Sequence, residues 1–166
     1  MVRNFYGHLK QECEIAAKQL RKYSKKNGWF YEAEFVALVY HRLLKRNGYT
    51  PNCLNLENYY DQELQGKRVQ KHADMIFKQI GGLEEVVEVK PIWVFRDDEQ
   101  LLRDNSKRIL GDYKKLATLN FKNINAKYLV VPYLGECEFK PIKFRRAVKG
   151  IFPQNKLGYN IDLITC

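Results

Sequence analysis

The sequence has no pair of cysteines at the spacing of a metal site. Its four cysteines, Cys13, Cys53, Cys137 and Cys166, lie far apart, and no CxxC pair occurs. Because structural zinc sites use closely spaced ligands, we do not expect one here. We expect free thiols in a reducing compartment, with Cys166 exposed to solvent.

Long hydrophobic runs are also missing. No stretch of roughly 18 apolar residues, the length that indicates a membrane-spanning helix, occurs in the sequence. No apolar signal-peptide segment opens the chain. We therefore expect a soluble, cytoplasmic protein. The lack of repeats, low-complexity stretches and Ser- or Pro-rich linkers predicts a single domain over residues 1–166.

Acidic residues are in the minority. The chain has 19 Asp and Glu against 29 Lys and Arg, which gives a net charge of +10. Such an excess favours a polyanionic partner, because lysine and arginine contacts to phosphates release counterions. It favours nucleic acid without excluding ribosomes or acidic lipid. The 11 tyrosines and 9 phenylalanines argue against disorder.

The hydrophobic periodicity predicts an α/β fold. Helical spacing of apolar residues extends over residues 5–26, 31–46 and 98–119. Strand-like patterns occupy residues 53–59, 68–77, 84–94, 126–134 and 160–165. A turn at Gly81-Gly82 makes the second and third of these strands a hairpin, whereas residues 139–151 fit neither pattern. The order of the elements predicts a mixed central β-sheet flanked by helices.

The residues with chemical potential lie on the two strands of that hairpin. His72 and Asp74 lie on the first strand, and Glu88 and Lys90 lie in the apolar segment VVEVKPIWV of the second. Side chains alternate along a strand, so Glu88 and Lys90 point the same way. The hairpin brings Asp74 beside Glu88, and two adjacent carboxylates repel each other unless a cation lies between them. The alternative is that Glu88 and Lys90 merely pair on a solvated strand face.

These motifs, in this order, resemble those of the PD-(D/E)xK nuclease superfamily over residues 31–134. The matching pieces are a helix with a glutamate, an aspartate entering a strand, an ExK strand and a following αβ unit. One departure is that Ala73, and not proline, precedes Asp74. The resemblance implies a restriction-endonuclease-like αβββαβ core at residues 29–134. An extra N-terminal helix (1–28) and a basic C-terminal extension (135–166) would flank this core.

The resemblance also implies a magnesium-dependent endonuclease that hydrolyses phosphodiester bonds, with DNA favoured over RNA. Asp74, Glu88 and the carbonyl of Val89 would hold Mg²⁺, for which Mn²⁺ would substitute. Lys90 would orient or deprotonate the attacking water, or neutralise the transition state. The helix glutamate, Glu32, would bind the metal directly or through water.

Helical phase selects Glu32 as the helix glutamate. At 100° per residue, Glu32 falls in the middle of an apolar side, and Glu34 falls nearly opposite. That side carries Val36, Val39, Tyr40 and Leu43. The alternative is that Glu32 only favours the positive end of the helix. Glu57, on the first predicted strand, is the reserve candidate for the third carboxylate.

Several basic residues are candidates for contacts to nucleic acid. Together with His72, they are Arg103, Lys107, Lys114 and Lys115 on the long helix, and Lys143, Arg145 and Arg146 in the segment KPIKFRRAVK. Basic residues interleaved with an aromatic suit a groove that follows a phosphate backbone. The alternative is an ordinary solvated surface. No helix-turn-helix or zinc-finger pattern provides sequence-specific recognition.

Three functions of different classes therefore compete. The first is the nuclease, which would be guided by substrate structure, by a partner protein or by a homodimer. The second is a catalytically inactive nucleic-acid-binding module or subunit with the same fold. The third is a basic structural or assembly protein in which the ExK match is accidental.

Overall fold

The computed structural model describes residues 4–27, 32–64, 67–93, 98–119, 123–135, 140–152 and 161–166. Within these ranges the helices are α1 (Phe5–Asn27), α2 (Glu32–Leu44), α3 (Asp98–Thr118) and α4 (Pro141–Gly150). The strands are β1 (Leu54–Leu64), β2 (Lys67–Lys78), β3 (Glu84–Val89), β4 (Ile124–Val131) and β5 (Ile161–Thr165). The predicted helices and strands are all found, with ends shifted by a few residues.

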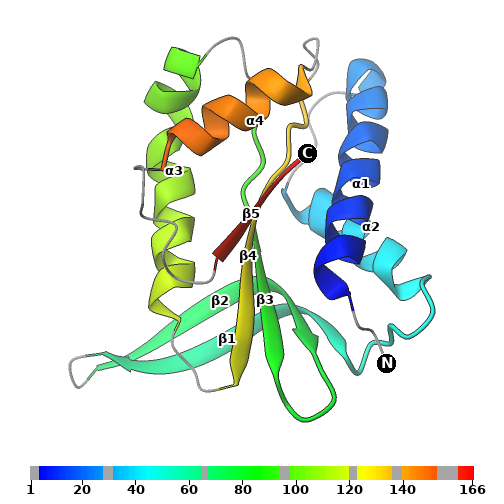
Figure 1. Cartoon of the computed structure of the whole chain (residues 1–166), viewed down its shortest axis with the longest axis vertical. Helices are drawn as coiled ribbons and strands as arrows, with labels where there is room; N and C mark the ends of the chain where they lie inside the picture. The colour runs from blue at the N-terminus through cyan, green and yellow to red at the C-terminus, as the bar shows by residue number, and fades with distance from the viewer. Residues whose placement is uncertain are drawn as a thin grey trace.

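The five strands form one mixed sheet in the order β1-β2-β3-β4-β5. Strand β2 pairs antiparallel with both β1 and β3, whereas β3, β4 and β5 pair in parallel. Helices α1 and α2 lie on one side of the sheet and α3 and α4 on the other, while the long β1–β2 ribbon extends beneath α3 (Figure 1). The predicted α/β fold, a mixed sheet flanked by helices, is therefore confirmed.

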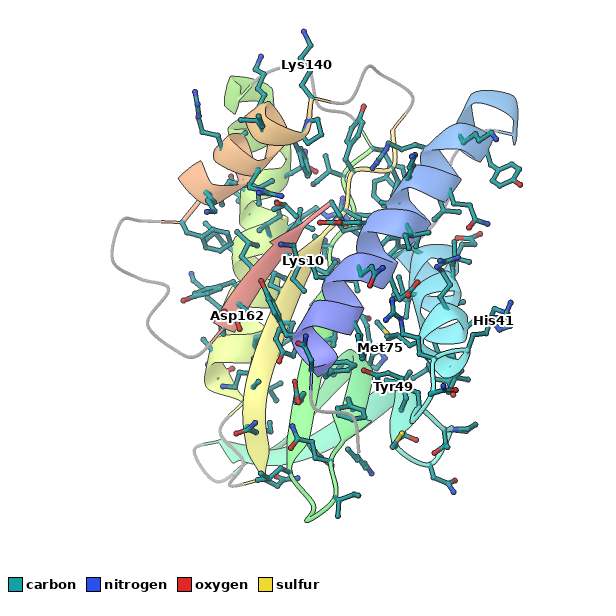
Figure 2. All side chains as sticks on the ribbon, turned by 45° about the vertical axis from the view of Figure 1, so that its right-hand side comes forward. Lys10, His41, Tyr49, Met75, Lys140 and Asp162 are labelled. Atoms are coloured by element: carbon teal, nitrogen blue, oxygen red, sulfur yellow. The ribbon has the colours of Figure 1, made fainter. Side chains whose placement is uncertain are left out.

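The two sides of the sheet have separate hydrophobic cores. Met75, Phe77, Val87 and Val89 pack with residues of α1 and α2, and the labelled Met75 lies among side chains between the sheet and these helices in Figure 2. The other core, with α3 and α4, receives Ile76, Val86, Leu129 and Val131. Strand β3 thus has apolar residues on both faces, as a central strand does. A carboxylate on such a strand needs a specific partner.

The β2–β3 turn fixes which residues lie opposite each other at the site. Gly81 and Gly82 have φ values of 98° and 82°, a left-handed conformation that glycine adopts without steric cost. The turn sets the pairing of Met75 with Val87. Continuing this antiparallel register by one residue places Asp74 opposite Glu88, as the hairpin predicted.

Strand β3 ends earlier than the predicted residue 94. Its last residue is Val89, and the amide of Lys90 still donates to the Val130 carbonyl over 2.8 Å. Pro91 has no amide hydrogen with which to continue the ladder. Among the described residues that follow, Ile92 forms an isolated bridge with Tyr133. Lys90 therefore lies directly after the carboxyl end of β3.

The C-terminal part of the chain belongs to the same fold. Residues 135–166, predicted as a basic extension, contribute α4 and the edge strand β5. Pro141 begins α4, and three apolar residues of this helix, Phe144, Ala147 and Val148, are buried at helical spacing. The expectation of an exposed Cys166 is wrong, because pairing of β5 with β4 buries this residue to 7% exposure. In the described ranges, no helix is long and apolar enough to cross a membrane.

Candidate active site

The predicted site residues come together where β3 ends, between α2 and α3. The amide of Val89 donates a 2.6 Å hydrogen bond to Asp74 Oδ2, which ties the aspartate of β2 to the neighbouring strand. Lys90, the next residue, makes ion pairs with one residue of each helix, Glu32 and Asp112. The residues predicted from the sequence therefore belong to one cluster, which the fold assembles from α2, β2, β3 and α3.

Glu88 is the most deeply buried acid of this cluster, with 4% exposure. Its Oε1 atom accepts a 2.6 Å hydrogen bond from Lys115 Nζ, whereas Oε2 is buried without a hydrogen-bond partner among the described residues. Burial and the negative charge of Asp74 raise the pKa of Glu88 to about 8, although Lys115 opposes the shift. The ion pair with Lys115 therefore does not bring the pKa of the buried Glu88 carboxyl back to its ordinary value.

Asp74 has a similar environment. It is 7% exposed, and burial raises its pKa above the ordinary value. The hydrogen bond from the Val89 amide opposes this rise, and the charge of Glu32 adds to it. Two neighbouring acids with raised pKa values are typical of a site that is completed by a proton or a cation.

Other buried acids of the described residues have conventional partners. Glu12 accepts from both Arg42 and Arg46. Glu85, on the same strand as Glu88, is hydrogen-bonded by Tyr128 and Gln79. Glu88 differs from these acids because one of its buried oxygens has no donor. Burial of a carboxylate on β3 is thus not unusual, but its incomplete partnering is.

Lys90 bridges the two helices. Its Nζ lies 3.0 Å from Glu32 Oε2 and 3.1 Å from Asp112 Oδ2. Burial acts to lower the pKa of Lys90, but the two carboxylates outweigh it and hold the pKa above the ordinary value. Lys90 is therefore an ammonium cation in this arrangement. The alternative of a Glu88–Lys90 pair on a solvated strand face is wrong, because Glu88 is buried and pairs with Lys115.

Glu32 enters the site as the helical phase predicted. It is the first residue of α2, and the buried stripe behind it is Phe35, Val36, Val39 and Leu43. Glu34 is exposed, as expected for the opposite side of the helix. The reserve candidate, Glu57, belongs to β1, but its side chain lies outside the described residues.

Two residues of α3 complete the cluster and were absent from the predicted catalytic set. Asp112 pairs with Lys90, and Lys115 pairs with Glu88. The sequence predicted Lys115 only as a phosphate contact. The available signal was an acid and a base one helical turn apart, beside the buried Ile109 and Leu116. Nothing local indicated that this edge of α3 faces the end of β3.

The donor chemistry of the cluster suits a hard divalent cation only in part. Asp74 and Glu88 are neighbouring carboxylates, and one Glu88 oxygen is unpaired; magnesium commonly uses one or two protein carboxylates together with water. In the described part of the chain, however, no group of three or more His, Cys, Asp or Glu side chains is arranged to hold a metal. Glu32 is paired with Lys90 and does not complete such a group.

A cleft of about 300 Å³ adjoins the cluster. Its polar lining consists of Glu32, Asp74 and His72, so His72 and Asp74 lie on the same side of β2. The rest of its lining is apolar and comes from Ala33, Val36, Ala37 and Leu56. The cleft therefore joins the two predicted carboxylates to an apolar wall formed by α2 and β1.

The predicted nucleic-acid contacts are mostly on the surface. Lys107 and Lys114 on α3, and Lys143, Arg145 and Arg146 on α4, are all exposed. Arg145 Nε also donates to Thr165 Oγ1 over 3.3 Å. Arg103 belongs to α3, with its side chain outside the described residues. Exposure leaves both the phosphate-contact and the solvated-surface interpretations open.

No protein-family model matches the sequence, and a search of curated proteins finds no match either. The geometry of the site is therefore the basis for a function.

Proposed function

We propose that the chain is a magnesium-dependent endonuclease of the PD-(D/E)xK type that acts on DNA. The observation that carries the proposal is the pair of buried carboxylates, Asp74 and Glu88, on adjacent strands with Lys90 at ExK spacing. The order α2-β1-β2-β3-α3-β4 supports the αβββαβ core of that superfamily, with α1 as the extra N-terminal helix.

Asp74, Glu88 and the Val89 carbonyl would hold the magnesium ion. When bound, Mg²⁺ lowers the pKa of a coordinated water and stabilises negative charge that develops on the phosphate. The contribution of the protein is a pair of carboxylates whose mutual repulsion and desolvation favour a cation over bulk water. Oε2 of Glu88, which has no hydrogen-bond partner among the described residues, is the oxygen that a bound cation would stabilise most.

Lys90 would stabilise charge and would not abstract a proton. Its raised pKa keeps it an ammonium group, and an ammonium group cannot accept a proton from water. Of the roles that the ExK motif leaves open, neutralising the developing charge on the phosphate fits this state best. Its contacts with Glu32 and Asp112 would hold it in position from both helices.

Glu32 and Asp112 are thus positioning residues for Lys90 in this proposal. Lys115 is the counter-ion of Glu88, and it lowers the pKa that burial raises. Magnesium would therefore compete with both a proton and an ammonium group for the Glu88 carboxylate. The competition makes metal affinity dependent on pH and on the α3 side chains.

A specific observation favours a second candidate, the nucleic-acid-binding module without cleavage. Lys90 and Lys115 already form ion pairs with Glu32 and Glu88, and the described residues contain no three-ligand group. A site whose acids already pair with lysines has less need for a metal. The net charge of +10 suits this candidate equally well.

One set of assays separates the candidates. Plasmid nicking with Mg²⁺ or Mn²⁺, absent in EDTA, is expected for the nuclease. A gel shift in EDTA without nicking under any condition would favour the binding module. Neither nicking nor a shift would favour the basic structural protein.

A further inference from the structure

We propose that the cleft beside the carboxylates receives an unpaired nucleobase next to the scissile phosphate. This inference rests on the proposed nuclease function and names its substrate class: a strand with an unpaired nucleotide at the cut site, not a closed duplex. The evidence lies in the position, lining and charge of the cleft.

The position of the cleft ties it to the reaction. Glu32 and Asp74 line it and also belong to the proposed active site. Lys90 Nζ lies 3.0 Å from Glu32 Oε2, so a cation stands at the boundary between the two. A group in the cleft and a phosphate at the carboxylates and Lys90 would therefore be neighbours, as a base and its own phosphate are.

The apolar lining suits a flat group. Ala33 and Ala37 are one helical turn apart on α2, and both are exposed. Because their side chains are small, they take up little space at the α2 side of the cleft. Val36 and Leu56 complete the wall, and Leu56 is 37% exposed although it is a large apolar residue. An exposed apolar surface of this kind gains from covering by an aromatic ring system, and every base has one.

The charges of the cleft select the base over the backbone. Among the described residues, the lining of the cleft includes two carboxylates, Glu32 and Asp74, and no lysine or arginine, so the cleft offers a phosphate group no counter-ion. A base is uncharged, and its amino and imino groups can donate to carboxylates. The phosphate would instead remain on the side of Lys90.

A base in a closed duplex cannot enter a side cleft, because it is stacked and paired. Extruding it costs free energy, and the cost is smallest when the nucleotide is already unpaired. A fork, a flap or a single strand therefore places a base in the cleft more readily than an intact duplex does. Such a preference would make the enzyme selective for the structure of its substrate.

The experiment uses the full chain and forked and fully paired oligonucleotides of the same cut sequence, as DNA and as RNA. Ala37→Phe places a ring over the cleft from an exposed helix position. The matched control is His41→Phe, on the same helix; His41 is exposed and points outward in Figure 2. Rates are measured with Mg²⁺. Binding is measured in EDTA with 2-aminopurine at the cut site, whose fluorescence rises when the base unstacks.

We expect the parent to prefer the fork and Ala37→Phe to lose about tenfold in the ratio of fork to duplex rates, the equivalent of one lost base contact. The 2-aminopurine signal should fall with it, while His41→Phe matches the parent in both readouts. Circular dichroism confirms that both variants are folded, and Leu56→Ser, which removes apolar wall without filling the cleft, serves as a second variant.

The possible outcomes distinguish failure of the base site from failure of the nuclease function. Cleavage with the same ratio in parent and Ala37→Phe overturns the base site and leaves the nuclease intact. A 2-aminopurine signal that Ala37→Phe abolishes, without cleavage by the parent, supports the base site and overturns the nuclease. No signal in the parent, or an equal signal in parent and Ala37→Phe, overturns the base site. A fork preference in DNA alone or in RNA alone identifies the strand chemistry.

Discussion

Lys115 Nζ lies 2.6 Å from Glu88 Oε1, so a residue of α3 forms an ion pair with the glutamate of the ExK motif. The side chain of Glu88 is 5% exposed and that of Lys115 is 25% exposed, so the lysine is the more solvent-accessible partner of the pair. In the metal-free protein, Lys115 therefore stabilises the ionised form of the buried Glu88.

The first prediction concerns this ion pair. At pH 9 in EDTA, where Glu88 is largely ionised, Lys115→Ala should lower the free energy of unfolding by ~1–3 kcal/mol, because a buried carboxylate loses its cation. Lys114→Ala, one residue away and exposed, should change it by less than ~0.5 kcal/mol. Urea unfolding measures both. Equal effects of the two substitutions would show that Glu88 does not depend on Lys115.

The second prediction is a dependence of stability on pH. The pKa of Glu88 is about 8 in the folded protein, above its ordinary value of 4.5. Between these values the folded state binds more protons than the unfolded state, so the contribution of Glu88 makes the free energy of unfolding fall as pH rises toward 8. The raised pKa of Asp74 acts in the same direction.

Glu88→Gln removes this titration and keeps the shape of the side chain. Its free energy of unfolding in EDTA should fall less between pH 5.5 and 8.5 than that of the parent; these working values are chosen to bracket the shift roughly. Adding Mg²⁺ should stabilise the parent more at the higher pH, because fewer protons compete for the carboxylate. Parallel pH profiles for parent and Glu88→Gln would rule out this titration.

The third prediction concerns the bridge formed by Lys90. Lys90→Ala should reduce kcat by ~10²-fold or more, while the increase in Tm that Mg²⁺ gives to the parent persists. Asp112→Asn should lose a smaller factor, about tenfold in kcat, because it orients the ammonium group without contacting the phosphate. An Asp112→Asn effect confined to KM would place Asp112 in substrate binding instead.

The fourth prediction concerns the exposed arginines of α4. If they contact phosphates, the Arg145→Ala, Arg146→Ala double variant should reduce the slope of log K against log salt by roughly one to two. Lys18→Ala with Lys22→Ala on α1, which are also exposed, provides a control of equal charge change. If both double variants change the slope equally, net charge explains binding and α4 is not a specific contact.

Local pattern predicted much of the fold and part of the site. Strand alternation and the Gly81-Gly82 turn were sufficient to bring Asp74 opposite Glu88, because register follows from the turn. Helical phase was sufficient to predict that Glu32 faces the interior. Both are properties of a few consecutive residues.

The remaining features depend on docking between distant elements. Asp112 and Lys115 meet the end of β3 only because α3 packs across the sheet, which no local periodicity specifies. The cleft likewise exists only where α2 meets β1. Helix α4 was missed although Pro141 and the buried spacing of Phe144, Ala147 and Val148 indicated it, since its many basic residues suggested a surface connector.

The proposed nuclease function is tested by cleavage of plasmid and forked oligonucleotide by the parent and by Glu88→Gln, each with Mg²⁺ and with EDTA, beside a thermal melt. We expect metal-dependent cleavage and metal stabilisation in the parent, and the loss of both in a folded Glu88→Gln protein. Cleavage by Glu88→Gln at the rate of the parent, or a parent that neither cleaves nor gains stability from Mg²⁺, would contradict it.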